Sequence, residues 1–449
     1  MNHAAALGEE KIAKLLWRFS APAIVGMVVN ALYNIVDSVF VGNGVGEIGL
    51  AAVTIAFPIM LVLMGIGMLI GIGASTLVSI RLGEERRDDA ENILGNAFVL
   101  IILLAILSTG GTLLFLEPVL VLLGAEENVL SYASDFTRII LWGSIFMHIG
   151  FGLNNIIRAE GNPKVAMATM LISAILNTIL NPIFIFILKM GIAGSALATV
   201  IAQAVSAVWV LYYFTGKTSV LKLKSSNLRL DKDVVMEICK LGFSPFAMQI
   251  AASLVTILFN QSLLHFGGEL AVASIGIINR VAMLILMPVF GISQGVQPIL
   301  GYNYGAKNYN RVLEALKIGI YAATAVSVFG FIMTQVFSEK IVRVFNNNPE
   351  LIAIGSNGLR ILLVMLPIIG FQIIGANYFQ ATGKAGYAAL LSMSRQVIIL
   401  IPAILILPGF FGLRGIWSAG PVADFASSLL TGGLLWLEVR KLGVMEKQL

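Results

Sequence analysis

Long apolar segments dominate the chain, and short polar breaks separate them. Twelve such segments occupy about 15–42, 50–80, 93–116, 131–157, 165–188, 192–214, 236–265, 271–299, 312–337, 351–379, 386–407 and 413–437. Each is longer than the roughly 20 residues that a helix needs to cross the hydrocarbon core of a bilayer. None shows the two-residue alternation of a β-barrel strand. The pattern predicts an all-α polytopic membrane protein with twelve transmembrane helices.

Composition supports this prediction and excludes other classes. Of the 449 residues, 58% are hydrophobic and 12% are charged, and the mean hydropathy is +0.92. Soluble domains carry about 25% charged residues, so a soluble enzyme, a nucleic-acid binder and a disordered scaffold are all excluded. The net charge of +5 is the excess of Lys and Arg typical of cytoplasmic loops, and no nucleic-acid partner is expected. A single cysteine, Cys239, excludes an intramolecular disulfide.

The basic residues predict the orientation of the chain. Between the spans, 21 Lys and Arg lie on the side that holds both termini and the segment 215–235, and 6 lie on the other side. Positive charge accumulates in cytoplasmic loops. Both termini are therefore expected in the cytoplasm, and the protein is expected to be a multi-pass protein of the cell (inner) membrane.

The two halves of the sequence look duplicated. Gly83 precedes Gly305 by 222 positions, Gly161 precedes Gly383 by the same number, and Gly191 precedes Gly412 by 221. A nearly constant offset across three turns indicates a repeated six-helix unit. Six is even, so both copies enter the membrane in the same direction, as in transporters built from parallel repeats. We expect an N-terminal lobe over 1–214, a basic cytoplasmic linker over 215–235 and a C-terminal lobe over 236–449.

One polar stripe in the first span is the sharpest candidate site. Asn30, Tyr33, Asn34 and Asp37 follow steps of three and four residues, which places them on one helix face. A carboxylate inside a span is costly and marks a functional site by default. The alternative is a carboxylate that reaches the outer interface or caps a neighbouring helix. The whole polar face favours function, and Asp37 has no basic residue at similar depth in its own half.

Other spans repeat such stripes with neutral residues. They are Ser173, Asn177 and Asn181 in the fifth span, Ser195, Thr199, Gln203 and Ser206 in the sixth, and Gln249, Ser253, Thr256 and Asn260 in the seventh. Small polar residues often only hold helices together. Beside a lone carboxylate, the stripes of the first half are better interpreted as the lining of a hydrated cavity.

The second half carries its deep charges elsewhere, at Arg280, Arg395 and Asp424. Arg395 and Asp424 lie on adjacent helices and are expected to form a buried ion pair. Arg280 would then lack an acid, and it would line the cavity or bind backbone carbonyls. Pro22 with Gly26 is a candidate hinge in the first span, because proline removes a helix hydrogen bond and favours a kink.

The motifs of several other activities are missing from the sequence. It contains no GxxxxGK[ST] phosphate loop, no HExxH and no TVGYG filter, and it has only three histidines. ATP hydrolysis, catalytic zinc and potassium-selective conduction have no basis in such a chain. We expect no catalytic residues, no enzymatic activity and no cofactor.

Longer motifs carry a family resemblance. The stretches Ser20-Ala21-Pro22-Ala23 and Asn30-Ala31-Leu32-Tyr33-Asn34-Ile35-Val36-Asp37 resemble the first helix of the multidrug and toxic compound extrusion (MATE) transporters. Gly161-Asn162-Pro163, Gln380-Ala381-Thr382-Gly383 and Asn177-Thr178-Ile179-Leu180-Asn181-Pro182 are similar to further motifs of that family. The resemblance covers about 15–440 and is strongest to the bacterial MepA-like group, close to the DinF-type branch.

The resemblance implies an antiporter that exports amphipathic, mostly cationic drugs or toxic compounds against H⁺ or Na⁺ by rocking two lobes around a central cavity. Family motif positions match Asp37, Asn177 and Thr199, with Tyr33 and Asn155 nearby. The second acid that is often found in the fifth helix falls at Asn181. This leaves one carboxylate, enough for one proton or one Na⁺, and puts a two-acid mechanism in doubt.

The hypothesis assigns a role to each candidate residue. Asp37 takes up H⁺ or Na⁺, with Asn177, Asn181 and Thr199 as neutral ligands, and its neutralisation releases the substrate and lets Pro22 bend. The residues expected to line the substrate cavity are Asn30, Tyr33, Asn34, Asn155, Gln203, Gln249, Asn260 and Arg280. The expected partners are small organic substrates and the lipid bilayer, and a monomer suffices.

Three alternative functions stay open on the sequence. A lipid-linked saccharide flippase of the same superfamily would have Arg280 and Arg395 as its best support. A major-facilitator transporter shares the six-plus-six plan, but the loop Arg81–Asp88 lacks that family's glycine signature. A membrane scaffold would leave the stripe around Asp37 unexplained.

Overall fold

The computed structural model describes residues 4–446 and contains helices but no strands in that range. The first half contains α1 (Ala5–Glu9), α2 (Ile12–Gly44), α3 (Glu47–Gly83), α4 (Arg87–Leu114), α5 (Leu116–Leu122), α6 (Glu127–Ala159), α7 (Pro163–Pro182), η1 (Ile183–Ile187) and α8 (Gly191–Thr215). The second half contains η2 (Ser225–Asn227), α9 (Lys232–Gly305), α10 (Tyr309–Val336), α11 (Ser338–Phe345), α12 (Pro349–Leu362), α13 (Leu366–Ala381), α14 (Ala385–Met393), η3 (Ser394–Leu400), α15 (Ile401–Phe411) and α16 (Leu413–Glu446).

The helices follow the twelve expected spans, with local differences. In the described part, ten helices are long and apolar enough to cross a membrane, and α12 with α13 forms a further span bent by 48°. The 74-residue α9 holds two of the expected spans, because Gly268 breaks it with φ 66° and ψ −168°. Glycine tolerates this positive φ, which side chains disfavour. The all-α, twelve-span prediction is confirmed, whereas the span expected over 351–379 as one segment is bent in its middle.

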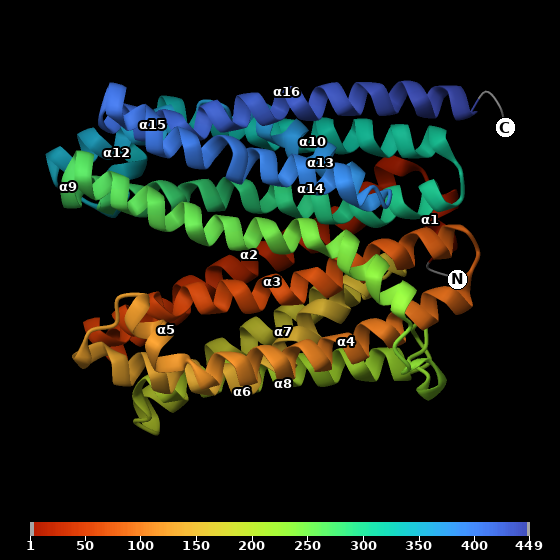
Figure 1. The fold of residues 1–449 in the computed structure, drawn as a ribbon, viewed down its shortest axis with the longest axis horizontal. Helices are drawn as coiled ribbons and strands as arrows, with labels where there is room; N and C mark the ends of the chain where they lie inside the picture. The colour runs from red at the N-terminus through yellow and green to blue at the C-terminus, as the bar shows by residue number, and fades with distance from the viewer. Residues whose placement is uncertain (1–3, 447–449) are drawn as a thin grey trace. The chain divides into compact units, whose positions relative to one another are not determined.

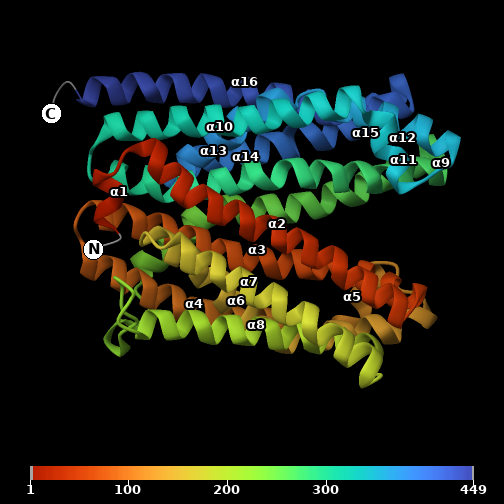
Figure 2. The same cartoon turned by 180° about the vertical axis from the view of Figure 1, so that it is seen from behind.

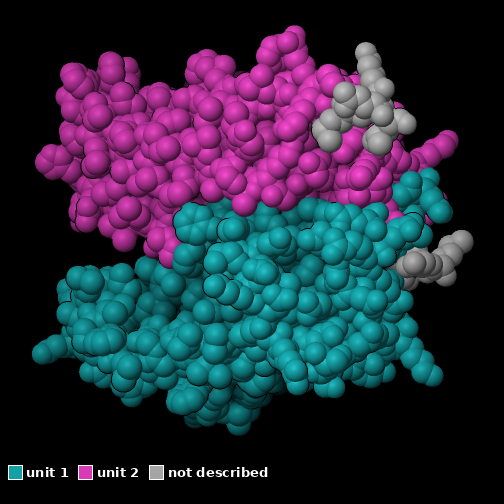
Figure 3. Space-filling model, turned by 45° about the vertical axis from the view of Figure 1, so that its right-hand side comes forward, with its two compact units in different colours: residues 1–9, 25–246 teal, residues 10–24, 247–449 magenta. Residues whose placement is uncertain are grey.

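Spatial proximity divides the helices into two compact units (Figure 3). Unit 1 contains residues up to Glu9 together with Val25–Phe246, and unit 2 contains Glu10–Ile24 and the chain from Ala247 onward. Two helices therefore contribute to both units. α2 passes from unit 2 to unit 1 between residues 24 and 25, and α9 passes from unit 1 to unit 2 between residues 246 and 247. These two points are 222 positions apart, the same offset as the repeated turns. The lobe boundaries expected at 214 and 236 stay a prediction.

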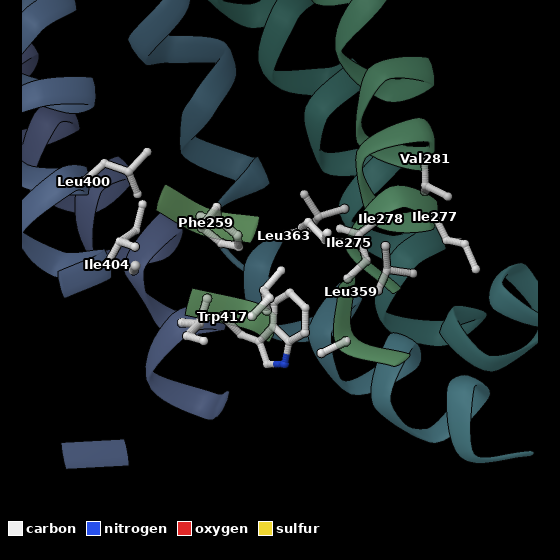
Figure 4. Packing of buried hydrophobic residues seen from close by; sticks show 14 of the residues in the cluster. Phe259, Ile275, Ile277, Ile278, Val281, Leu359, Leu363, Leu400, Ile404 and Trp417 are labelled. Atoms are coloured by element: carbon white, nitrogen blue, oxygen red, sulfur yellow. The ribbon is translucent and has the colours of Figure 1, made fainter. Parts of the chain in front are cut away.

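Each unit has its own apolar core. In unit 1, α6 runs beside α8 (Figure 1) and α7 lies beside α8 (Figure 2), and buried residues such as Leu63, Phe136 and Leu141 fill the space between helices. In unit 2, Trp417 packs with Phe259, Ile278 and Leu359 in a larger cluster (Figure 4). Because the alternative environment of these side chains is lipid and not water, their packing stabilises the units through close van der Waals contacts and not through the hydrophobic effect.

Two glycines at equivalent positions of the repeat allow close contacts between helices from different halves of the sequence. A Cβ at Gly73 of α3 would lie 2.1 Å from the backbone oxygen of Ile238 and 3.1 Å from the backbone nitrogen of Gly242, both in the first part of α9. A Cβ at Gly295 of α9 would lie 2.7 Å from the backbone nitrogen of Ser20 in the first part of α2. Small residues let helix backbones approach closely inside membranes. Gly73 and Gly295 are 222 positions apart. The repeat predicted from the turns therefore also relates these two helix–helix contacts.

The segment between α8 and α9 is bound to unit 1. The buried carboxylate of Glu160, which follows α6, accepts hydrogen bonds from the Ser219 hydroxyl at 2.8 Å and the Leu221 backbone nitrogen at 3.1 Å, and also from the Tyr213 hydroxyl. Leu221 is completely buried. The Lys, Ser and Asn content of this segment predicts a linker, but it does not indicate this attachment.

A second carboxylate and an amide extend the attachment. Glu91 on α4 is 1% exposed, pairs with Lys224 and accepts from the Lys222 backbone nitrogen at 3.2 Å. Asn96, which is further along α4, accepts from the Asp231 backbone nitrogen at 2.7 Å. Buried polar groups need such partners. The basic linker is therefore part of the folded surface of unit 1.

Glu160 gives this attachment a dependence on pH. Burial raises the pKa of Glu160 to about 6, against the opposing effects of its hydrogen bonds from Tyr213, Leu221 and Ser219 and of the charge on Lys222. When the linker detaches, the carboxyl group is solvated and its pKa returns towards its ordinary value. The attached state then binds the proton more tightly, so attachment strengthens as pH falls through about 6 and this contribution is lost as pH rises.

We predict that the opening equilibrium of the segment 219–223 decreases by about tenfold between pH 7.5 and pH 5. Hydrogen–deuterium exchange, corrected for the intrinsic rate at each pH, measures this change. Glu160→Gln keeps the size of the side chain and removes its titration, so its exchange should not change with pH. A wild-type protein with the same flat profile would contradict the role of Glu160.

Candidate functional site

Asp37 lies on α2 in unit 1, where α7 and α8 supply its partners. The Asn181 side-chain amide donates a hydrogen bond to the Asp37 carboxylate, and the Ser195 hydroxyl lies 3.4 Å from the same oxygen. No ion pair to Asp37 occurs among residues 4–446. The carboxylate is therefore held by neutral donors from two helices that are more than 140 residues away in the sequence.

A second layer of contacts joins Asn177 and Thr199. The Asn177 amide donates to the Thr199 hydroxyl at 3.0 Å, and that hydroxyl donates to the Ser195 backbone oxygen at 3.1 Å. Asn177 precedes Asn181 by one helical turn, as does Ser195 relative to Thr199. Helical periodicity places each pair on one face of its own helix. The contact between α7 and α8 brings these two faces together beside Asp37.

Two oxygen atoms in this cluster have no hydrogen-bond partner. The side-chain Oδ1 atoms of Asn177 and Asn181 are buried, and no described residue donates to either. An unsatisfied buried acceptor costs about 1–3 kcal/mol. A carboxylate with amide and hydroxyl oxygens is the type of ligand set that hard cations prefer. The arrangement can hold a small monovalent cation or a proton on Asp37.

The backbone beside the cluster is irregular. Asn181 is the penultimate residue of α7, Pro182 ends that helix, and the chain continues as the π-helical turn Ile183–Ile187. Proline removes one backbone hydrogen bond, and π-helical turns are frequent at functional sites. The turn locally changes the direction in which the residues after Asn181 point.

The other stripe residues of α2 are placed differently. Tyr33 interacts with Thr199 and Asp37, so it belongs to the cluster. Asn30 and Asn34 are exposed, and the Asn34 amide donates to the Asn30 backbone oxygen at 2.7 Å. The structure thus brings Tyr33 to Asp37, while Asn34 is bound to its own helix.

Asn155 has its hydrogen-bond partners on its own helix. It lies four residues before the end of α6, where its amide donates to the Phe151 backbone oxygen at 2.9 Å and its oxygen accepts from Arg158. Asp37 lies seven residues before the end of α2 and has its partners on α7 and α8. These contacts do not join Asn155 to Asp37, and the expectation that Asn155 lies near it stays a prediction. Gln203 on α8 lies partly exposed, and its backbone oxygen faces Gly150 of α6.

The second-half candidates lie in unit 2. Gln249 is half-buried in α9, whereas Asn260 and Arg280 of the same helix are exposed. Arg280 has no carboxylate within ion-pair distance in the described chain. The hinge candidates lie on either side of the point where α2 passes from one unit to the other. Pro22 belongs to unit 2 and Gly26 to unit 1. A Cβ at Gly26 would lie 2.7 Å from the Met170 sulfur of α7.

The predicted ion pair in the second half is present. Arg395 Nε lies 2.6 Å from Asp424 Oδ1, joining the π-helical turn Ser394–Leu400 to α16. Asp424 is almost completely buried, and Arg395 is about one-third exposed. The sequence did not single out Ser195 as a partner of Asp37, although its place in the polar stripe of α8 could have indicated it. It also gave no role to the buried acids Glu91 and Glu160.

Comparisons with known proteins agree with this fold. A family model described as MatE matches residues 22–183 and 245–405. The multidrug export protein MepA of Staphylococcus haemolyticus (strain JCSC1435) is 28% identical over 411 residues, with 91% of this chain and 90% of that protein covered. MepA of Staphylococcus aureus (strain MSSA476) is 28% identical over 408 residues, with the same coverage.

Solved structures extend the comparison. The MATE multidrug transporter DinF-BH, solved in complex with rhodamine 6G, is 44% identical, covers 96% of both chains and superposes with a TM-score of 0.90. An outward-facing MATE family transporter of the MOP superfamily superposes with a TM-score of 0.92 over 99% of both chains, at 23% identity. The fold and the polar cluster define a multi-span membrane protein of the transporter class. The chain belongs to the MatE family, as the sequence motifs indicated.

The Arg395–Asp424 pair should act as a structural unit. We predict that Arg395→Gln and Asp424→Asn each lower the unfolding temperature of the purified protein. The double variant should lose less than the sum, with a coupling energy of the order of 1 kcal/mol, because removal of either partner leaves the other charge unpaired, and Asp424 buried as well. Additive losses would contradict a direct interaction.

Proposed function

We propose that the protein is a cation-coupled antiporter that exports amphipathic, mostly cationic compounds by alternating access, with Asp37 as the coupling carboxylate. The observation that supports this most is the polar cluster around Asp37. It combines one carboxylate, no basic partner among the described residues, and two unsatisfied amide oxygens. A structural carboxylate would be paired with a cation, as Asp424 is with Arg395.

The cluster favours H⁺ or Na⁺ as the coupling ion. A proton needs only Asp37 itself. Na⁺ would use Asp37 with the free Oδ1 atoms of Asn177 and Asn181 and the hydroxyl of Thr199, all neutral oxygens that are already gathered there. Because one carboxylate is available in the cluster, the stoichiometry is one monovalent ion per cycle.

Ion and substrate are coupled through charge. Ionised Asp37 attracts a cationic substrate in a region of low dielectric constant, where charges are weakly screened. Binding of H⁺ or Na⁺ neutralises Asp37 and removes this attraction, so the substrate is released on the side where the ion is abundant. Asn181 and Ser195 keep the carboxylate oriented in both states.

Alternating access uses the two units as moving bodies. The chain passes between them inside α2 and inside α9, at positions related by the repeat offset. Pro22 weakens the backbone hydrogen bonding of α2 shortly before its change of unit, which provides a place to bend. The basic side of the chain, with both termini and the bound linker, faces the cytoplasm in the inner membrane.

The relatives support the substrate class. MepA is named as a multidrug export protein, and DinF-BH was solved with rhodamine 6G, so this rhodamine is a suitable test substrate here. The alternative of a lipid-linked saccharide flippase has lost part of its support. Of the two arginines that favoured it, Arg395 is neutralised by Asp424, and only Arg280 remains without an acid in the described chain.

Transport by Asp37→Asn tests the proposal. We predict that this variant, reconstituted in liposomes, loses about 90% or more of the rhodamine transport that a proton or a Na⁺ gradient drives, because asparagine cannot change its charge. The two gradients are imposed separately in the wild-type protein, and the one that drives transport identifies the coupling ion.

Asp135→Asn is the matched control, because Asp135 is an exposed residue on α6 in the same unit. It should transport at the wild-type rate, and both variants should unfold at the wild-type temperature. Full gradient-driven transport by Asp37→Asn would contradict the proposal. Transport that ignores both gradients in the wild-type protein would favour a flippase.

A further inference from the structure

A cavity of about 570 Å³ lies in unit 2, where α14 begins and α16 approaches its end. Its polar part contains Lys384, Tyr387 and Lys441, and its apolar part contains Leu390 and Leu437. The loop before α14 and the end of α16 are both on the membrane side that the basic residues assign to the cytoplasm. The cavity therefore combines apolar walls with cationic groups at one face of the membrane.

The charges in the cavity do not cancel. Lys384 forms an ion pair with Glu438, which also lines the cavity. Lys441 is exposed and has no carboxylate within ion-pair distance in the described part of the chain. Two lysines and one glutamate leave one net positive charge, carried by Lys441.

The repeat shows what covers the corresponding place in unit 1. With the offset of 222, Lys384 corresponds to Asn162, and with the offset of 221 that relates α8 to α16, Lys441 corresponds to Val220. Asn162 caps the start of α7 through its own side chain, and Val220 lies between Ser219 and Leu221 in the linker segment that Glu160 binds. Ser219 and Leu221 are buried there, so the chain itself fills this place in unit 1.

Unit 2 lacks each of these features. The residue that corresponds to Glu160 is Thr382, and no side chain caps the start of α14. Instead of turning back, α16 continues as a helix past the position that corresponds to the end of α8. The linker fills this position in unit 1, whereas the equivalent position in unit 2 is left open as the cavity.

The adjacent surface of α16 has the character of a lipid interface. Trp436 is 54% exposed, and the Arg440 guanidinium lies 3.7 Å from the centre of its ring. Leu437, one residue further along, is exposed and also lines the cavity. Tryptophan and basic residues are enriched where helices leave the hydrocarbon core. Basic pockets between helices on the cytoplasmic side bind lipid headgroups.

We propose that this cavity binds the phosphate headgroup of an anionic phospholipid from the cytoplasmic leaflet, with Lys441 as the main cation and the acyl chain along Leu390 and Leu437. Glu438 opposes the binding through its negative charge while it holds Lys384 in place. The site is distinct from the Asp37 cluster, and it makes unit 2 the lipid-sensitive half of the protein.

Native mass spectrometry of the purified full-length protein, titrated with phosphatidylglycerol in detergent, tests the proposal. Lys441→Gln should weaken binding about fivefold, since one basic residue near an anionic lipid surface contributes about that factor. Glu438→Gln should strengthen binding by a similar factor, because it frees Lys384. Lys217→Gln, which alters an exposed lysine of the linker in unit 1, should bind as the wild-type protein does.

Two further measurements make the outcome decisive. Inorganic phosphate in about tenfold excess over the lipid should not displace phosphatidylglycerol, and displacement would show a free-anion site instead. Equal losses in Lys441→Gln and Lys217→Gln would show unspecific attraction to surface charge and overturn the proposal. Unfolding temperatures of all variants are measured without added lipid, and Lys441→Gln alters only an exposed side chain, so its folding should be retained.

Discussion

A carboxylate without a basic partner, partly buried among apolar helices, is the constraint from which the proposed transport chemistry follows. Asp37 is held by the Asn181 amide and lies near the Ser195 hydroxyl, on two helices distant in sequence. Neutral donors stabilise the ion less than an arginine would, so its charge remains available for exchange. The free oxygens of Asn177 and Asn181 add ligands that a cation can use. Asp424, by contrast, is paired with Arg395, which supports a structural role for Asp424 and the proposed coupling role for Asp37.

Duplication explains the architecture around this acid. The offset of 222 relates turns, the glycines Gly73 and Gly295, and the two points where α2 and α9 change unit. The copies have diverged in their polar and charged side chains. The first contains the carboxylate cluster and binds the linker through Glu91 and Glu160, whereas the second contains an ion pair and a cationic cavity. In the function that we propose, this divergence assigns ion coupling to the first half and leaves the second free for different contacts.

Most of the fold could be predicted from the sequence, because apolar length and charge bias determine spans and their number in a membrane. The polar face of α2 and those of α7 and α8 followed from helical periodicity, and the Arg395–Asp424 pair followed from two deep opposite charges on adjacent spans. Three features required the structure. The hydrogen bonding of Asn155 depends on its neighbour Arg158, the attachment of the linker on buried acids that look like ordinary loop residues, and the break of α9 on the backbone angles of Gly268. Each is a tertiary contact or a local conformation that no periodic pattern encodes.

Competition between the coupling ion and the substrate for Asp37 is the central claim. Equilibrium binding of the rhodamine to the purified wild-type protein measures this competition, with Na⁺ replaced by choline at constant ionic strength and, separately, with pH varied. Competition predicts that bound rhodamine decreases as the coupling ion is added, with a midpoint that rises in proportion to the rhodamine concentration once the dye exceeds its dissociation constant. Rhodamine binding that is independent of both Na⁺ and pH would contradict the claim.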